Sequence, residues 1–153
     1  MLINNDQDFK KAISELNITD QRKLAAKFVE SVLYLNPDPL IKNALEIAGK
    51  KIVSDSDKKE FEAAYKNIKS LAVNTYTACG GDADWPAQAA HFIATATKAC
   101  LTPAERLDSN KLAWKCAMQL RMAKNCEMIE SDNDVIDNEA QNQYIIINDF
   151  IRK

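Results

Sequence analysis

Hydrophobic side chains recur every three or four residues along most of this 153-residue chain, which is the spacing of amphipathic helices. Apolar and polar residues do not alternate over any long stretch, as they would in half-buried strands. We therefore predict an all-α protein, a single compact bundle of about six or seven amphipathic helices with short loops, occupying one domain over residues 1–153. The expected helices are 6–16, 21–35, 39–48, one that begins within 54–60 and runs into Gly80, 85–101, one after Thr102, and one whose apolar face includes Ile136, Tyr144, Ile147 and Ile151.

Residues typical of helix ends support these bounds. Thr19 or Asp20 is expected to cap the second helix, because a short polar side chain there can accept a hydrogen bond from a free backbone N–H group. Asp38 followed by Pro39 has the pattern of a cap and a first-turn proline. Gly49 stands where a residue in the left-handed conformation would end the same helix.

The stretch "TACGGDADWPAQAAHF" holds two of the three glycines and the only histidine of the chain. Gly80 and Gly81 allow positive φ after a helix, Asp82 or Asp84 offers a cap, and Pro86 fits the first turn of the next helix. We interpret the stretch as a corner between two helices. The alanine-rich helix that follows is expected at the centre of the bundle, because small side chains let neighbouring helices approach closely.

A threonine, a proline and a glutamate further along have the pattern of a capping box. In such a box the Thr102 oxygen and the Glu105 side chain would each bond to a backbone N–H at the start of a helix, with Pro103 in its first turn. The sequence therefore predicts a new helix beginning at this point.

Composition limits the classes of function. A formal net charge of −2 and a pI near 5.5 give no broad basic field, so we expect no nucleic-acid partner. No apolar run approaches the ~20 residues of a membrane span, and the N-terminus has no signal-peptide pattern, so we expect a cytoplasmic protein without membrane contact. The four cysteines would then be reduced thiols, with no C-x-x-C spacing among them.

Residues suited to catalysis or metal binding are few. His91 is the only histidine, and the Glu-x-x-His and H-E-x-x-H patterns of helical metal sites are absent from the sequence. We interpret His91 as a packed or hydrogen-bonded helix residue, Cys100, Cys116 and Cys126 as small core side chains, and the two tryptophans as mainly core residues. We therefore expect no catalytic residue, metal or cofactor.

An acidic stretch, "ESDNDVIDNE", supplies the main candidate for binding. Asp132 and Asp134 do not have the glycine and glutamate of a calcium loop at the required positions after them. The stretch is interpreted either as a solvated turn and helix start or as a surface for a partner protein that is basic. The candidate binding residues are Asp132, Asp134, Asp137 and Glu139, together with Trp85 and His91 at the corner.

Two resemblances to known families rest on quoted stretches. "ELNITDQRKLAAKFVESVLYLNPDPL" and "DWPAQAAHFIATATKACLTPAERLDSNKLAWKCAMQLR" resemble small all-helical bacterial proteins of the YjaG type, although Ser31 stands where that family has an arginine. "NALEIAGKKIVSD", "AAYKNIKSLAVNTYTA" and "AAHFIATATKAC" are similar to all-helical immunity proteins of bacterial toxin systems. Both resemblances imply a helical fold, and the second implies a role in binding another protein.

Three hypotheses for the function follow. The first is a non-catalytic protein-binding module, immunity-like in its mode of action, with an acidic rim. The second is a small-molecule binder or enzyme with a pocket near His91, Cys79 and Trp85. The third is a self-associating structural protein, a homodimer formed through the exposed side of the C-terminal "YIIINDFI" helix.

Overall fold

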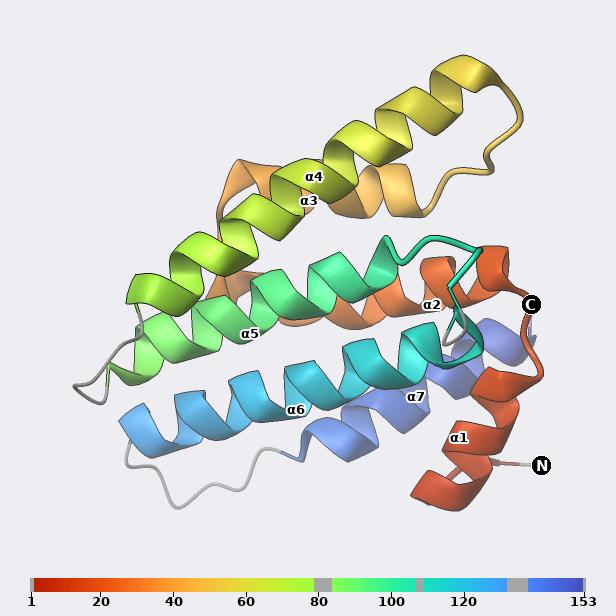
Figure 1. Ribbon diagram of the computed structural model, residues 1–153. Helices are drawn as coiled ribbons and strands as arrows, with labels where there is room; N and C mark the ends of the chain where they lie inside the picture. Colours follow the sequence, from red (N-terminus) through yellow and green to blue (C-terminus); the bar gives the residue numbers. More distant parts are fainter. Residues whose placement is uncertain (1, 79–83, 107–108, 132–137, 153) are drawn as a thin grey trace.

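Helices make up most of the computed structural model, which describes residues 2–78, 84–106, 109–131 and 138–152 (Figure 1). The described residues form seven α-helices and two short 3-10 helices, η1 and η2, and contain no strand. The prediction of an all-α protein with six or seven helices is confirmed. In chain order the elements are α1 (Asp6–Ser14), α2 (Ile18–Glu30), η1 (Leu33–Leu35), α3 (Pro39–Ala48), α4 (Asp55–Ala78), α5 (Trp85–Cys100), η2 (Ser109–Lys111), α6 (Leu112–Ser131) and α7 (Glu139–Arg152).

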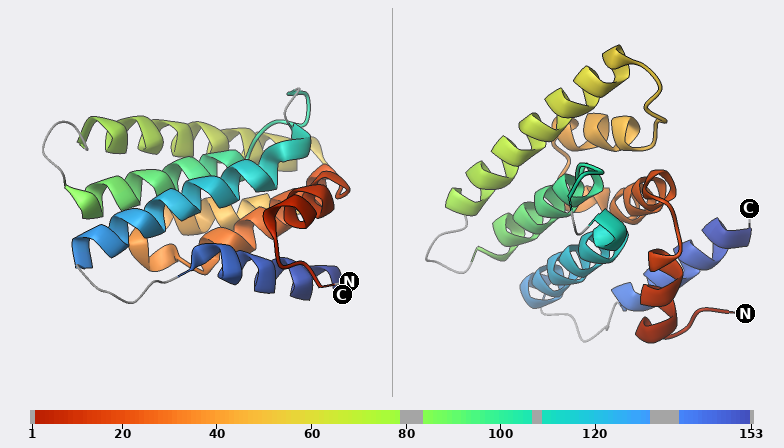
Figure 2. Two further views of the ribbon diagram at one scale, coloured as in Figure 1. Left: turned by 90° about the horizontal axis from the view of Figure 1, so that it is seen from below. Right: turned by 45° about the vertical axis from the view of Figure 1, so that its right-hand side comes forward.

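Helices α5 and α6 run antiparallel through the middle of the bundle, and α2 packs against both (Figures 1 and 2). The pair α3 and α4 covers one side of α5, while α1 and α7 lie on the side of α6 (Figure 2). The expectation that α5 is central is confirmed, because α2, α3, α4 and α6 all contact it. One cluster of buried apolar residues draws members from all seven helices.

The close contact between α5 and α6 is built from small side chains. Ala96 on α5 and Ala113 and Ala117 on α6 are completely buried. Cys100 and Cys116 lie in the same interface with their sulfurs 3.7 Å apart, and burial together with the neighbouring Cys100 raises the pKa of the Cys116 thiol. Cys100 and Cys116 are free thiols, and Cys126 is buried as well. The interpretation of these three cysteines as core side chains is confirmed.

Two of the predicted caps are present. The carboxylate of Asp38 accepts a hydrogen bond from the Leu40 N–H at the start of α3, at 2.9 Å, with Pro39 as the first helical residue. The carboxylate of Asp84 accepts from the Ala87 N–H at the start of α5, at 3.1 Å. The other predicted cap for α5, Asp82, lies outside the described residues.

Three predictions about helix ends were wrong. Asn17 caps α2 instead of Thr19 or Asp20, because the helix starts at Ile18 and the Asn17 side chain accepts from the Asp20 N–H at 2.8 Å. Gly49 has right-handed angles, φ −78° and ψ −7°, and its N–H still bonds to the Leu45 carbonyl. No positive φ is therefore needed where α3 ends.

The capping box at Thr102 is the third error. The Thr102 hydroxyl donates to the Ala99 carbonyl at 2.7 Å, so it satisfies the end of α5 and does not begin a new helix. Helix α6 starts later, at Leu112, directly after η2. A threonine after a helix can use its oxygen backward as well as forward, and the sequence pattern alone does not distinguish the two.

Candidate functional site

The acidic stretch contributes one described residue to the candidate binding set. Asp132, Asp134 and Asp137 lie outside the described residues. Glu139, the first residue of α7, is only 6% exposed, and its carboxylate accepts a hydrogen bond from Asn142 at 3.1 Å. Burial leaves Glu139 little surface to present to a partner.

Two of the three candidate residues near the corner, His91 and Trp85, lie on α5. His91 lies on α5, partly buried, with its Nδ1 atom 3.0 Å from the Thr75 hydroxyl of α4. Trp85 is the first residue of α5 and is also partly buried, whereas Cys79 lies outside the described residues. His91 thus bonds across two packed helices, which agrees with its interpretation as a hydrogen-bonded helix residue.

The environment of His91 gives a testable pH dependence. Burial lowers its pKa below 6.5, and this outweighs the opposite effect of a hydrogen bond with the Ala72 carbonyl. The folded protein therefore binds fewer protons at His91 than the unfolded chain, so this contribution to stability is present above about pH 6.5 and is lost as the pH falls through the folded pKa. A proton NMR titration of this single histidine should give a midpoint below 6.5.

A midpoint at or above 6.5 would contradict the lowered pKa of His91. A His91→Gln variant provides the control for the effect on stability. Its free energy of unfolding should decline less than that of the wild type between pH 7.5 and pH 5, because the variant has no imidazole to protonate.

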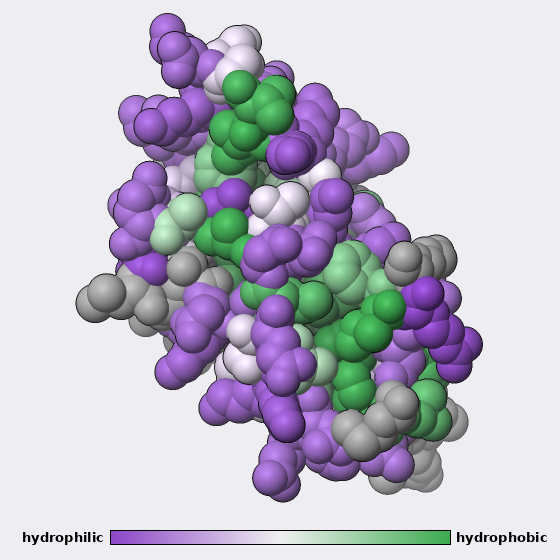
Figure 3. Space-filling view, turned by 90° about the vertical axis from the view of Figure 1, so that its right-hand side faces the viewer, coloured by the Kyte–Doolittle hydropathy of each residue, from purple (hydrophilic) through white to green (hydrophobic). Residues whose placement is uncertain are grey.

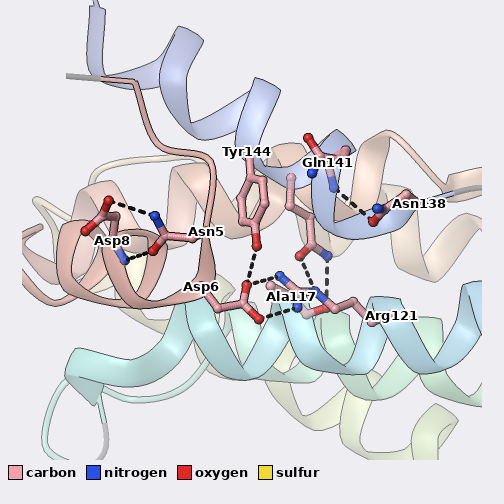
Figure 4. A network of polar contacts seen from close by, with 9 residues as sticks. Asn5, Asp6, Asp8, Ala117, Arg121, Asn138, Gln141 and Tyr144 are labelled. Carbon is pink, nitrogen blue, oxygen red and sulfur yellow. Dashed lines mark hydrogen bonds and ion pairs between the residues drawn. The ribbon is translucent and has the colours of Figure 1, made fainter.

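A polar network joins α1, α6 and α7 (Figure 4). The Arg121 guanidinium donates to both carboxylate oxygens of Asp6, at 2.8 and 2.9 Å, and Tyr144 donates to the same carboxylate at 2.6 Å. Arg121 Nε also donates to the side-chain oxygen of the buried Gln143 at 2.9 Å, and the Gln143 amide donates to the Ala117 carbonyl. The contact with Arg121, and to a lesser extent that with Tyr144, lowers the pKa of Asp6. We refer to these residues as the Asp6 network.

A buried lysine connects η1 to α6. Lys124 is nearly inaccessible, and its ammonium group donates to the Tyr34 hydroxyl at 2.7 Å and to Glu127 at 2.6 Å. Neither this cluster nor the Asp6 network was predicted from the sequence. The only sequence signal for the Lys124 cluster was a lysine among the apolar positions of α6. The contacts themselves join residues 90 and 115 positions apart, and such contacts leave no local pattern in the sequence.

Exposed hydrophobic side chains border a wide hollow between the N-terminal segment, α2 and α7. Leu2 and Ile145 are 61% and 68% exposed there, and the hollow has a volume of about 620 Å³. Figure 3 shows hydrophobic atoms at the surface near the two chain ends, beside hydrophilic ones. The charged residues of its border are Lys27 and Glu30 on α2 and Asp149 and Arg152 on α7. We call these six residues the terminal surface.

The N-terminal segment is fixed against α7 by a pair of hydrogen bonds. The Ile3 N–H donates to the Asn148 side-chain oxygen, and the Asn148 amide donates to the Ile3 carbonyl, each at 2.9 Å. Leu2 therefore directly adjoins a segment that is fixed to α7, and Asn148 itself lines the hollow.

In the described part of the chain, no group of three or more histidine, cysteine, aspartate or glutamate side chains is placed to hold a metal ion. No helix in the same residues is both long and apolar enough to cross a membrane.

Comparison with known proteins yields no match to a family model, to a curated protein sequence or to a solved structure. The resemblances to YjaG-type proteins and to immunity proteins therefore stay predictions from the quoted residues.

Proposed function

We propose that this protein is a non-catalytic protein-binding module whose recognition surface is the terminal surface. The observation that supports the proposal is the exposure of two large aliphatic side chains, Leu2 and Ile145, around one hollow. Apolar side chains framed by charged residues are the usual composition of a protein interface with an apolar centre and a polar rim.

A second copy of the chain fits the charges of this surface. The α2 part carries one cation and one anion, Lys27 and Glu30, and the α7 part carries the same combination, Asp149 and Arg152. In a two-fold symmetric contact the α2 part of each copy can face the α7 part of the other with opposite charges paired. The proposed partner is therefore a second copy, which agrees with the hypothesis of a homodimer through the C-terminal helix.

Sedimentation velocity over a range of concentrations tests the proposal. Wild-type protein should sediment as a species of twice the 17.1 kDa chain mass at high concentration. Ile145→Lys places a charge at the centre of the contact, so its dimer dissociation constant should rise by about 10- to 100-fold.

Ile129→Lys is the matched control, because Ile129 is also exposed on a helix but lies at the end of α6, outside the terminal surface. This variant should dimerise as the wild type does. A wild-type chain that stays monomeric at all concentrations, or equal dissociation constants for the two variants, would refute the terminal surface as the interface.

A basic partner at the acidic stretch stays a separate prediction. Neutralising Asp132, Asp134 and Asp137 by substitution with Asn should lower the association rate of a basic partner at low salt, because long-range attraction between opposite charges accelerates encounter. An unchanged rate would contradict the acidic-rim hypothesis while leaving the terminal surface unaffected.

A further inference from the structure

A second hollow lies at the other side of the bundle, between α2, the first half of α4 and the segment that follows α5. Its volume is about 340 Å³, and its lining is mostly apolar, with Phe61 and Tyr65 of α4, Ile52, and Pro103 among its walls. It is smaller than the hollow at the terminal surface and shares no residue with it. Hydrophobic atoms also surface in the upper part of Figure 3, near the end where α4 begins.

Arg22 of α2 lines this hollow and is buried, with 7% of its surface exposed. Its Nη2 atom donates to the Thr102 carbonyl at 2.8 Å, and the guanidinium carbon lies 4.4 Å from the centre of the Phe61 ring. These contacts hold the guanidinium in one orientation. They do not account for Nε, which is buried without a hydrogen-bond partner among the described residues.

A buried donor without an acceptor is costly, and folded proteins contain few of them. Glu105, an exposed residue of the lining, acts on Arg22 through its charge but makes no ion pair with it within the described structure. The site therefore combines an oriented cation, an unused donor and apolar walls. An anionic oxygen bound against the guanidinium would supply the acceptor that Nε lacks.

We propose that this hollow binds a small apolar carboxylate, an aryl or short-chain alkyl acid, with the carboxylate at Arg22 and the apolar body against Phe61 and Tyr65. The volume favours a small acid, since it lies at the lower end of the ~300–1,000 Å³ of ordinary ligand pockets. The lining contains three cationic residues, Arg22, Lys58 and Lys66, and two acidic ones, Glu62 and Glu105. Its net charge is therefore positive, which favours an anion. This site is independent of the protein-binding function proposed above.

An NMR titration of the wild-type chain with 3-phenylpropionate tests the site. Saturable shifts should appear in the backbone amides of Phe61, Tyr65 and Ala104, with a Kd in the millimolar range or tighter, about what a ligand of this size can achieve. The neutral analogue 3-phenylpropan-1-ol has the same apolar body. The alcohol should bind at least ~10-fold more weakly, because a hydrogen bond between charged groups contributes more binding free energy than a neutral one, by an amount equivalent to about that factor in affinity.

Two variants locate the ligand. Arg22→Met keeps the side-chain volume and should weaken phenylpropionate binding at least ~10-fold while leaving the alcohol unaffected. Ala104→Trp fills the hollow from an exposed lining position and keeps Arg22 in the chain, so it should abolish binding of both compounds even if Arg22→Met folds poorly. Ala63→Trp, on an exposed position of α4 outside the lining, is the matched control and should bind as the wild type does.

Three results would overturn the proposal. The first is the absence of saturable shifts up to 10 mM, roughly the weakest Kd the ligand size predicts. The second is equal affinity for the acid and the alcohol, which would mean that Arg22 does not recognise the carboxylate. The third concerns a peptide with a free C-terminal phenylalanine. If it binds at least ~10-fold more tightly than phenylpropionate, and also than the same peptide with an amidated C-terminus, the hollow is a site for a peptide end.

Discussion

Replacing Phe9 with alanine should destabilise the protein by about 4 kcal/mol, within the range for deleting a buried aromatic ring. Phe9 is completely buried, and its ring centre lies 5.8 Å from Phe28 of α2, 5.9 Å from Trp114 of α6 and 5.4 Å from Tyr144 of α7. The loss would therefore leave a cavity where four helices meet. Urea unfolding followed by circular dichroism measures the change in the free energy of unfolding.

Lys11→Ala is the control for Phe9→Ala. Lys11 is exposed on the same helix, so this change should alter the stability by less than about 0.5 kcal/mol. The two alanines separate the loss of the ring from any effect of helix propensity in α1. A Phe9→Ala variant as stable as Lys11→Ala would show that α1 is not anchored by this ring.

The second large effect is expected for Gln21→Leu, with a loss of about 3 kcal/mol. Gln21 is fully buried in α2, and its amide nitrogen donates to the Leu16 carbonyl at 3.3 Å and to the Asn110 carbonyl at 2.8 Å. Its oxygen accepts from the Ala113 N–H at 3.2 Å. Leucine has a similar size but leaves two or three backbone groups unsatisfied, at about 1–3 kcal/mol for each one that stays buried.

Gln141→Leu makes the same chemical change on an exposed position of α7, and we expect it to be nearly neutral. Hydrogen exchange gives a second measurement on Gln21→Leu. The Ala113 amide should lose protection more than amides in the middle of α6, because its acceptor is removed. Equal stability of the two leucine variants would mean that other groups satisfy the α6 start.

The helical pattern predicted the fold class because amphipathic spacing is a local property. Phe61, Ile68 and Ala72 recur on one stripe of α4 and are all buried, as expected. Helix ends were predicted less well, since Asn17 and Thr19 both have suitable side chains and only the backbone decides between them. The prediction of the buried face of the C-terminal helix was also partly wrong. Tyr144 and Ile147 are buried, but Ile151 is 51% exposed near the end of α7.

The candidate sites were harder to predict, because each depends on residues that are distant in the sequence. Arg22 looks like an exposed residue of an amphipathic helix until the Thr102 carbonyl and the Phe61 ring are placed against it. Leu2 and Ile145 are unremarkable separately, and only the fold sets them around one hollow. The acidic stretch was selected by its composition, but Glu139, the one described residue among its candidate binding residues, is buried.

The hydrogen bonds between Ile3 and Asn148 also constrain the timing of folding on the ribosome. Their partners are 145 residues apart, and synthesis at ~5–20 residues per second separates them by roughly 7–30 s. Arg121 and Tyr144, which bind Asp6, also emerge after most of the chain. Until α6 and α7 have been made, α1 has α2 as a neighbour but none of these later partners, so its attachment to the bundle is completed only then.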